Sequence, residues 1–447
     1  MVQSQPTTTT TKRTRTTTTT TRSSSSSSST SSSLIEQKNN TLFETLFLKI
    51  PTSTSSRSNL RFITKQPHVA GTVGDEIMAD FMTQEFQQYG IPQVSKFELQ
   101  VKLNHPKMMA GDNARSSVTL KNKRNKMELK VEDDDDDDDG GRMASTADDA
   151  AATGGDRKSS DDDNDNTYEV IYKAKLTEDI LLEDDTSDTI WRNHTFHGYS
   201  PSGKIFNAPY VYANYGRPQD FDKLTNAGIN VNNTIVIVRY GQCFRGLKVK
   251  NAQLRGAAGV IIYSDPYDDG YAIGKVYPNG PWRPSYGIQR GSVQFNSICG
   301  GDPYRIDTRY VTKFNQTLKD ICGVNSHLEL IPSIPSIPMS YGDITPILHN
   351  IGGPLAIDVG GDDFVGGIYN LTYRVGIGSS STETETENDD NAAAAASSSA
   401  SVAVLDMIIE NEESSIQSIP NVIGIIPGSL PPERDMPVLL GNHRDAW

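Results

Sequence analysis

Three low-complexity stretches interrupt this chain and limit which residues can form a hydrophobic core. Residues 1–33 are almost all Thr and Ser, and residues 379–401 consist of Thr-Glu repeats followed by an Ala-Ser run. Residues 108–166 contain the unbroken aspartates Asp133–Asp139. Segments of this composition bury too little apolar surface to offset the entropy lost on ordering. We therefore expect long disordered segments here and folded structure between them.

Charge and composition exclude some classes of function. The formal net charge of -14 argues against a nucleic-acid partner, because phosphate contacts need clustered Lys and Arg. Much of that charge lies in the acidic run, which could bind calcium but which we interpret as a solvated, self-repelling loop. With 447 residues, the chain can form about two or three domains.

The sequence leaves the cellular compartment open. No segment approaches the ~20 apolar residues that span a bilayer, and the N-terminus lacks the apolar region of a signal peptide. The acid-free, Arg-bearing leader is typical of either a transit peptide or a plain low-complexity tail. Glycosylation triplets that permit a secretory route occur at Asn39, Asn193, Asn232, Asn315 and Asn370.

The three cysteines, Cys243, Cys299 and Cys322, contain no Cys-x-x-Cys spacing, which argues against a thiolate zinc site. Cys299 and Cys322 are the pair to test for a disulfide. Free buried thiols are an equally open alternative.

Residue patterns predict a mixed α/β fold. Strands are expected at 210–215, 234–240 and 259–263, with helices at 217–224 and 248–256 between them. This order indicates a compact mixed domain with antiparallel additions. Other expected elements are helices at 43–50, 58–62 and 342–350, strands at 94–103, 402–409 and 421–426, and a helix at 74–89 with Ile77, Phe81, Phe86 and Tyr89 on one face and Gly90 after its end.

The last residues of the sequence carry a candidate metal ligand. A hairpin is expected at 427–437, followed by a buried strand at Val438–Leu440 that Gly441 ends. His443 would then lie at the carboxyl end of a strand, where open α/β sheets bind ligands. Asp445, two residues on, could accept from its second ring nitrogen and fix the tautomer. The alternative is a polar turn, and His68 is likewise interpreted as structural rather than a ligand.

Eight segments occur in the order found in one known family, and the sequence resembles the glutamate carboxypeptidase and transferrin receptor family. The match runs from about Leu42 to Trp447 and is interrupted by the low-complexity inserts. Its segments are Pro67–Thr72, Val211–Phe221, Ile237–Gly241, Lys248–Pro266, Gln289–Val293, Gly301–Pro303, Ile337–Tyr341 and Gly441–Trp447.

The resemblance implies an incomplete α/β peptidase sandwich with an inserted β-rich, α+β protease-associated domain. A disordered leader would occupy 1–38 and the N-terminal part of the peptidase domain 39–103. The inserted domain would occupy 104–414, with disordered inserts near 108–166 and 379–401. The main peptidase domain would start in 415–447, and we expect the chain to be the front part of something longer.

The resemblance also implies roles for individual residues. His443 matches the first zinc ligand of a site for two zinc ions, and Asp445 matches its supporting carboxylate. Arg217 matches an arginine that holds a substrate carboxylate, a role that suits a planar guanidinium. Arg305 falls where a calcium-binding hydroxyl is found, and its charge would repel calcium. The asparagine that assists substrate binding in the family's carboxypeptidases has no match in Pro281–Pro284, which weakens the case for a preference for acidic substrates.

Two functions follow as hypotheses. The first is a zinc exopeptidase that hydrolyses peptide bonds near a free C-terminal carboxylate, for which this chain alone would be inactive. The second is a non-catalytic, transferrin-receptor-like protein that binds through the inserted domain. Resemblance implies a peptide substrate and a lumenal or extracellular, secretory or membrane-associated location. A homodimer is expected only if the family's helical domain is present.

Overall fold

The computed structural model describes residues 41–107, 116–123, 168–304, 317–376, 403–412, 415–431 and 433–446. The segments 1–33 and 379–401, and most of 108–166, lie outside these residues. The prediction of disorder is wrong for one part of 108–166, because Ser117–Lys123 forms strand β2. Val118 and Leu120 alternate with polar residues and are fully buried, so a short alternation forms a strand where neighbouring strands cover it.

The first of two compact units ends at Lys65. Its described part contains a helix at 41–49 and helix α2 (Ser53–Ile63), which confirms both helices predicted there. Thr52 caps α2, since its hydroxyl accepts a hydrogen bond from the Ser55 N–H at 3.1 Å. No residue of α2 is buried, so local hydrogen bonds rather than a core hold this helix within its unit.

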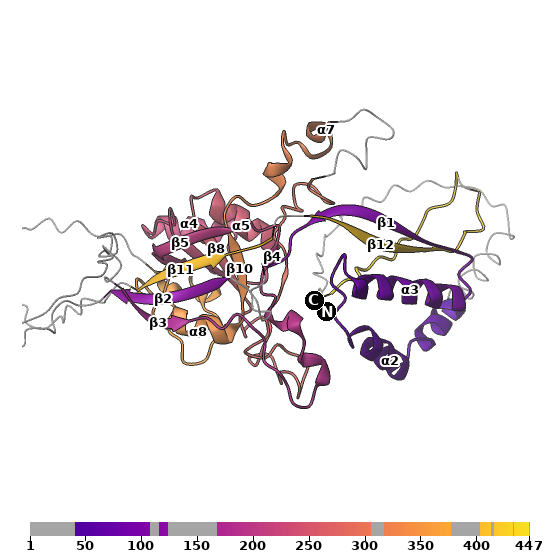
Figure 1. Cartoon of the computed structure of the whole chain (residues 1–447), viewed down its shortest axis with the longest axis horizontal. Coiled ribbons are helices and arrows are strands. Elements are labelled where there is room, and N and C mark those ends of the chain that lie inside the picture. The colour runs from indigo at the N-terminus through magenta and orange to yellow at the C-terminus, as the bar shows by residue number, and fades with distance from the viewer. Residues whose placement is uncertain are drawn as a thin grey trace, which may run out of the picture. The chain divides into compact units, whose positions relative to one another are not determined.

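In the second unit, a long antiparallel pair joins two distant parts of the sequence. Strand β1 (Gln93–Leu103) pairs with β12 (Ser415–Ile425) along its whole length. The strand predicted at 94–103 is confirmed, and the one predicted at 421–426 is the end of the longer β12. Figure 1 shows the two strands side by side, as a two-stranded ribbon. The residues between them therefore leave this ribbon and return to it as an insertion.

Helix α3 (Val73–Gln88) confirms the predicted helix, and the apolar residues predicted on one face are not its most buried ones. Ile77 is 54% and Tyr89 73% exposed. The buried residues are Asp75, Met78 and Ala79, a stripe at helical spacing. The buried stripe contains the carboxylate of Asp75, which accepts from the Gly71 N–H and pairs with Arg444, and the pattern of apolar residues gave no signal for it.

A four-stranded parallel sheet forms the centre of the inserted part. Its order is β6 (Tyr210–Tyr212), β7 (Ile235–Arg239), β8 (Gly259–Tyr263) and β10 (Ser336–Met339). Helices α4 (Pro218–Asn226) and α5 (Arg245–Gln253) connect the first three strands, and α8 (Tyr341–His349) follows the fourth. Every residue of β7 and β8 is buried, which explains their continuous runs of β-branched residues.

A second, antiparallel sheet packs on the same core. Its order is β3 (Tyr168–Lys173), β2, β11 (Val404–Ile409) and β5 (Gly203–Ala208). Leu405 and Met407 of β11 share one hydrophobic cluster with Val260 and Ile261 of β8. At Gly259 a Cβ atom would lie 2.2 Å from Cε of Met407, so the close approach of the two sheets requires glycine. The predicted mixed α/β architecture with antiparallel additions is confirmed.

The remaining elements are short and flank these sheets. Strands β4 and β9 pair in parallel, and the others are single turns of helix. They are β4 (His197–Gly198), β9 (Gly291–Ser292), η2 (Asp185–Ser187), η3 (Ile190–Asn193), α7 (Leu318–Cys322), η4 (His327–Leu330), α9 (Ala356–Gly360) and η5 (Asp362–Phe364). No helix in the described part of the chain is both long and apolar enough to cross a membrane.

The structure contradicts the predictions for the last strand. The described residues of 427–437 do not form a hairpin, and Val438–Leu440 is not a strand. The three apolar side chains are 87%, 88% and 96% exposed. A short apolar run becomes a buried strand only when neighbouring strands pair with it, and no described strand pairs with this one.

The structure decides the cysteine alternatives. Cys299 and Cys322 form a disulfide, and Cys243 is a free, half-buried thiol. The disulfide ties α7 to the segment that follows Phe295, beside the small cluster around Val324 and Leu330.

We predict that the chain from an oxidising compartment exposes one thiol when denatured without reductant, because only Cys243 is unpaired. Thiol titration in guanidinium measures this number directly, and reduction should raise it to the three cysteines of the sequence. The Cys243→Ser variant should expose none before reduction. Three thiols in the unreduced wild-type chain would contradict the pairing.

Candidate functional site

His443 lies on the surface at the end of the described chain, with its ring held by a local hydrogen bond. Its side chain is 82% exposed. Its Nδ1 lies 2.9 Å from the carbonyl oxygen of Asp445, whereas the nearest carboxylate oxygen of Asp445 is 3.6 Å away. A carbonyl can only accept, so this contact assigns the proton to Nδ1 and leaves the Nε2 lone pair free to ligate. Both the backbone carbonyl and the carboxylate of Asp445 thus lie near Nδ1, and the carbonyl is the closer acceptor.

The described residues supply one candidate zinc ligand but not a complete site. A zinc site takes at least three protein ligands. No group of three His, Cys, Asp or Glu side chains in the described ranges is arranged to hold a metal ion. The donor chemistry of His443 fits a zinc ligand, and the rest of such a site is not found among these residues.

Two contacts that the sequence patterns did not predict hold the His443 segment in place. The Arg444 guanidinium pairs with Asp75, whose side chain is fully buried in α3, and donates to the carbonyl of Pro420 at 3.0 Å. Ala446 and His68 exchange backbone hydrogen bonds of 3.1 and 3.3 Å. The first and last family segments are therefore joined, and His68 takes part through its backbone. The sequence feature that could have identified Asp75 is a charged residue in the first turn of α3.

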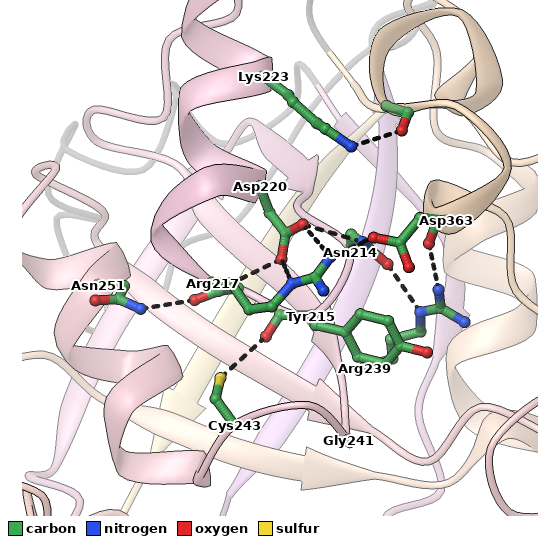
Figure 2. Close-up of polar contacts among 12 residues, drawn as sticks. Asn214, Tyr215, Arg217, Asp220, Lys223, Arg239, Gly241, Cys243, Asn251 and Asp363 are labelled. Carbon is green, nitrogen blue, oxygen red and sulfur yellow. Dashed lines mark hydrogen bonds and ion pairs between the residues drawn. The ribbon is translucent and has the colours of Figure 1, made fainter. Parts of the chain in front are cut away.

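Arg217 lies in the loop that connects β6 to α4, at the N-cap of that helix. Pro218 at the first helical position fixes the start of the helix. The Arg217 Nε and Nη2 atoms donate to the two carboxylate oxygens of Asp220 at 2.9 and 2.8 Å, and Nη2 also pairs with Asp363 of η5. The hydrogen bond to Asp220 is the main cause that raises the pKa of Arg217 above its usual range. Figure 2 shows this pairing.

A second guanidinium, that of Arg239, lies close to the first and is almost fully buried. Its side chain is 1% exposed. Nε donates to the side-chain oxygen of Asn214 at 2.9 Å, and Nη2 donates to the carbonyl of Asp363 at 2.5 Å. Nη1 lies 3.5 Å from the Asp268 carboxylate. Arg239 thus connects β7 to the turn after β6 and to η5 (Figure 2), and its ion pair with Asp268 connects it to the loop after β8.

The Tyr215 ring contacts both guanidiniums. Its centroid lies 3.9 Å from Cζ of Arg239 and 5.1 Å from Cζ of Arg217, within the range of cation–π attraction. Its hydroxyl donates to Asp268 at 2.9 Å. Burial raises the pKa of Asp268, and this hydrogen bond and the charge of Arg239 oppose that rise.

The Lys248 ammonium contacts the backbone of this cluster. The side chain is fully buried, and Nζ donates to the carbonyls of Tyr215 and Gly241 at 2.7 Å each. Burial lowers the pKa of Lys248 to about 8. These contacts fix the backbone of the loop that carries Arg217. An anion can bind this cluster only at the edges of the guanidinium groups that remain accessible.

The structure places the three predicted site residues in two local clusters. Arg217 is surrounded by Asp220, Asp363 and Arg239, whereas His443 and Asp445 lie in the segment joined to α3. Asp220 was within reach of sequence reasoning, because an acidic residue three positions after an N-cap is a capping signal. Asp363 was not, since 146 residues separate it from Arg217.

Comparisons with known proteins agree with this architecture. The PA domain model matches residues 202–294, which include β5 to β9 and, of the cluster around Arg217, all but Asp363. A probable glutamate carboxypeptidase of Arthroderma benhamiae is 41% identical over 282 residues, covering 62% of this chain and 34% of the relative. The glutamate carboxypeptidase 2 homolog of Caenorhabditis elegans is 29% identical over 392 residues, covering 87% and 40%. Aminopeptidase NAALADL1 of Rattus norvegicus is 32% identical over 259 residues, covering 56% and 30%.

These findings define the chain first as a protein with a protease-associated domain. The similarity to glutamate carboxypeptidases extends beyond that domain, so the chain resembles the glutamate carboxypeptidase and transferrin receptor family, as the sequence predicts. The chain spans between 30% and 40% of the length of these curated relatives.

We predict that Arg239→Lys lowers the free energy of unfolding by about 2–4 kcal/mol, because an ammonium cannot satisfy all the buried acceptors around the guanidinium. Urea denaturation monitored by circular dichroism measures this change. The matched control is Arg255→Lys, which also removes a guanidinium above an aromatic ring. Its partner Asp222 is 67% exposed, so a change below about 0.5 kcal/mol is expected. Equal effects would contradict the role of Arg239.

Proposed function

We propose that the chain belongs to a zinc-dependent exopeptidase that hydrolyses peptide bonds near a free C-terminal carboxylate. Arg217 binds that carboxylate, and His443 contributes a zinc ligand. The observation that carries the proposal is the orientation of His443, whose Nε2 is left free to ligate by the Asp445 carbonyl. The names of two relatives support the reaction class. Because the chain spans only part of these relatives, the activity is proposed for the whole protein and not for this chain alone.

The chemistry of the proposal is divided between metal and protein. Bound zinc, two ions by family resemblance, supplies a Lewis acid and an activated water. Among the described residues, Asp445 orients the His443 ring and Asp220 holds the Arg217 guanidinium in one plane. Calcium is not part of the proposal, since Arg305 would repel it.

The domain boundaries form part of the same proposal. Residues 39–103 and 415–447 belong to the peptidase domain and 104–414 to the inserted domain. The pairing of Leu103 with Ser415 at the end of the β1–β12 ribbon supports this division, because the chain leaves and re-enters the ribbon at those residues.

Location and partners follow from the same proposal. A lumenal or extracellular location in the secretory pathway is supported by the Cys299–Cys322 disulfide, since such bonds persist mainly in oxidising compartments. A peptide is the proposed substrate. Homodimers are proposed only for a protein that includes the helical domain of its family.

One observation favours a second candidate, a non-catalytic protein that binds through the inserted domain. Arg217 already pairs with two carboxylates of its own chain, Asp220 and Asp363. In the region described, no group of three side chains that could hold a metal ion accompanies His443. Metal analysis distinguishes the candidates, because a transferrin-receptor-like protein needs no zinc at His443.

We predict that His443→Ala lowers the zinc content of the protein expressed from its complete reading frame, and lowers peptidase activity by more than about 100-fold, because a ligand is lost. Elemental analysis after dialysis measures the metal, and hydrolysis of a dipeptide measures activity. The control is His349→Ala, which removes an exposed imidazole on α8 and should change neither. Unchanged zinc in the His443 variant would refute this assignment.

We predict that Arg217→Lys raises KM about tenfold for a peptide with a free C-terminal carboxylate, because the paired donors of the guanidinium are lost. Lysine keeps a cation beside the fully buried Asp220, so the fold should persist. KM for the same peptide with a C-terminal amide should not change. One relative is named an aminopeptidase, and equal effects on acid and amide would show that Arg217 does not read the C-terminus.

A further inference from the structure

The carboxylate of Asp363 lies against the edge of Arg217 that faces solvent. It pairs with Nη2 of Arg217 and accepts a weaker hydrogen bond from Nδ2 of Asn214 at 3.4 Å. The Asp363 side chain is 49% exposed, whereas that of Arg217 is 17% exposed. The contact between them is shown in Figure 2. Asp363 is therefore both the second counter-ion of Arg217 and part of its cover.

The donors of Arg217 are unequally occupied. Nε and one N–H of Nη2 bond to Asp220, which is fully buried and held in the capping box of α4. Nη2 has a second N–H, which bonds to Asp363. Nη1 forms no hydrogen bond with any residue in the described ranges. A second carboxylate can bind the Nη1–Nη2 edge in paired fashion only if Nη2 is released by Asp363.

The backbone around Asp363 is fixed, but its carboxylate is not. Lys223 donates to the carbonyl of Gly360 at 2.7 Å, and Arg239 donates to the carbonyl of Asp363 at 2.5 Å. The Phe364 ring is fully buried and lies edge-on to Tyr212 at 6.5 Å between centroids. The half-exposed side chain can thus rotate away from Arg217 without movement of η5, which is a small rearrangement for a ligand to cause.

The charge balance gives the consequence of this arrangement. Arg217 and Arg239 provide two positive charges, and Asp220 and Asp363 contact them with two negative charges. The pKa of Asp363 is lowered: burial alone would raise it, but the hydrogen bond and charge of Arg217 outweigh burial. At neutral pH the edge therefore carries a carboxylate that repels an incoming anion.

We propose that Asp363 is a specificity-determining residue whose carboxylate competes with the ligand carboxylate for Nη2 of Arg217 and weakens the binding of acidic ligands. This inference rests on the proposed role of Arg217. It concerns the selectivity of that site and is separate from zinc binding. Removal of the Asp363 charge strengthens binding of carboxylate ligands and leaves binding of their neutral amides unchanged.

The test measures binding of N-acetyl-L-alanine and of its C-terminal amide to the full chain by ligand-observed NMR. Asp363→Asn keeps the size of the side chain and the backbone acceptor for Arg239. We expect it to tighten binding of the acid about three- to fivefold, in keeping with the strength of a half-exposed ion pair. Asp362→Asn is the matched control, since it removes a neighbouring exposed charge of the same turn that pairs with neither guanidinium. It should leave affinity unchanged, and thermal melting should show that both variants fold.

The outcomes separate this inference from the proposed function. If Arg217→Lys weakens binding of the acid and Asp363→Asn does not tighten it, the competition is refuted while the role of Arg217 stands. If Arg217→Lys has no effect on the acid, both fail at this site. If Asp363→Asn instead weakens binding of N-acetyl-L-lysine amide, Asp363 recruits a cation and the competition is overturned. If Asp362→Asn tightens binding of the acid equally, the effect comes from net charge alone, and the proposed competition is also overturned.

Discussion

The burial of the Arg239 guanidinium is the constraint on which the inserted domain depends most. A cation is stable away from water only when its donors are satisfied and a counter-charge is near. Here one side chain on the central strand β7 reaches Asn214 after β6, Asp363 in η5 and Asp268 after β8. Three loops are thus fixed relative to one sheet, and the carbonyl that accepts from Arg239 belongs to the residue whose carboxylate covers Arg217. The position of the candidate binding residue is therefore a consequence of how a buried charge is satisfied.

The same physical solution recurs at the end of the described chain. Asp75 is a fully buried carboxylate, and Arg444 is its partner from the family's last segment. The residue next to Arg444 is His443, whose side chain is exposed and whose ring is held by a single carbonyl. In both places a buried charged group fixes the backbone, and a residue close to it in the fold, Arg217 or His443, carries the candidate binding group. Because the buried charges hold the backbone, the nearby group can bind a ligand without breaking their contacts.

Sequence reasoning succeeded where local periodicity decides the structure. The β-branched runs at 235–239 and 259–263 form strands that are buried on both faces, and the alternation in 94–103 forms a strand that pairs with β12. Sequence reasoning failed at Val438–Leu440, where a short apolar run lacks a described partner strand, and at 117–123, where a strand lies within a stretch that was interpreted as low-complexity. Arg217 and His443 could be identified by family segments. Asp363 could not, because only the folded chain brings it to Arg217, and no local pattern encodes a contact between distant loops.

The proposed zinc-ligand role of His443 depends most directly on which of its ring nitrogens binds the metal. Crystals of the protein expressed from its complete reading frame, measured on both sides of the zinc absorption edge, would locate zinc by its anomalous signal. We expect a zinc peak about 2.0–2.1 Å from Nε2 of His443, with Nδ1 still bonded to the carbonyl of Asp445. A zinc peak at Nδ1, or zinc elsewhere with His443 unbound, would contradict it.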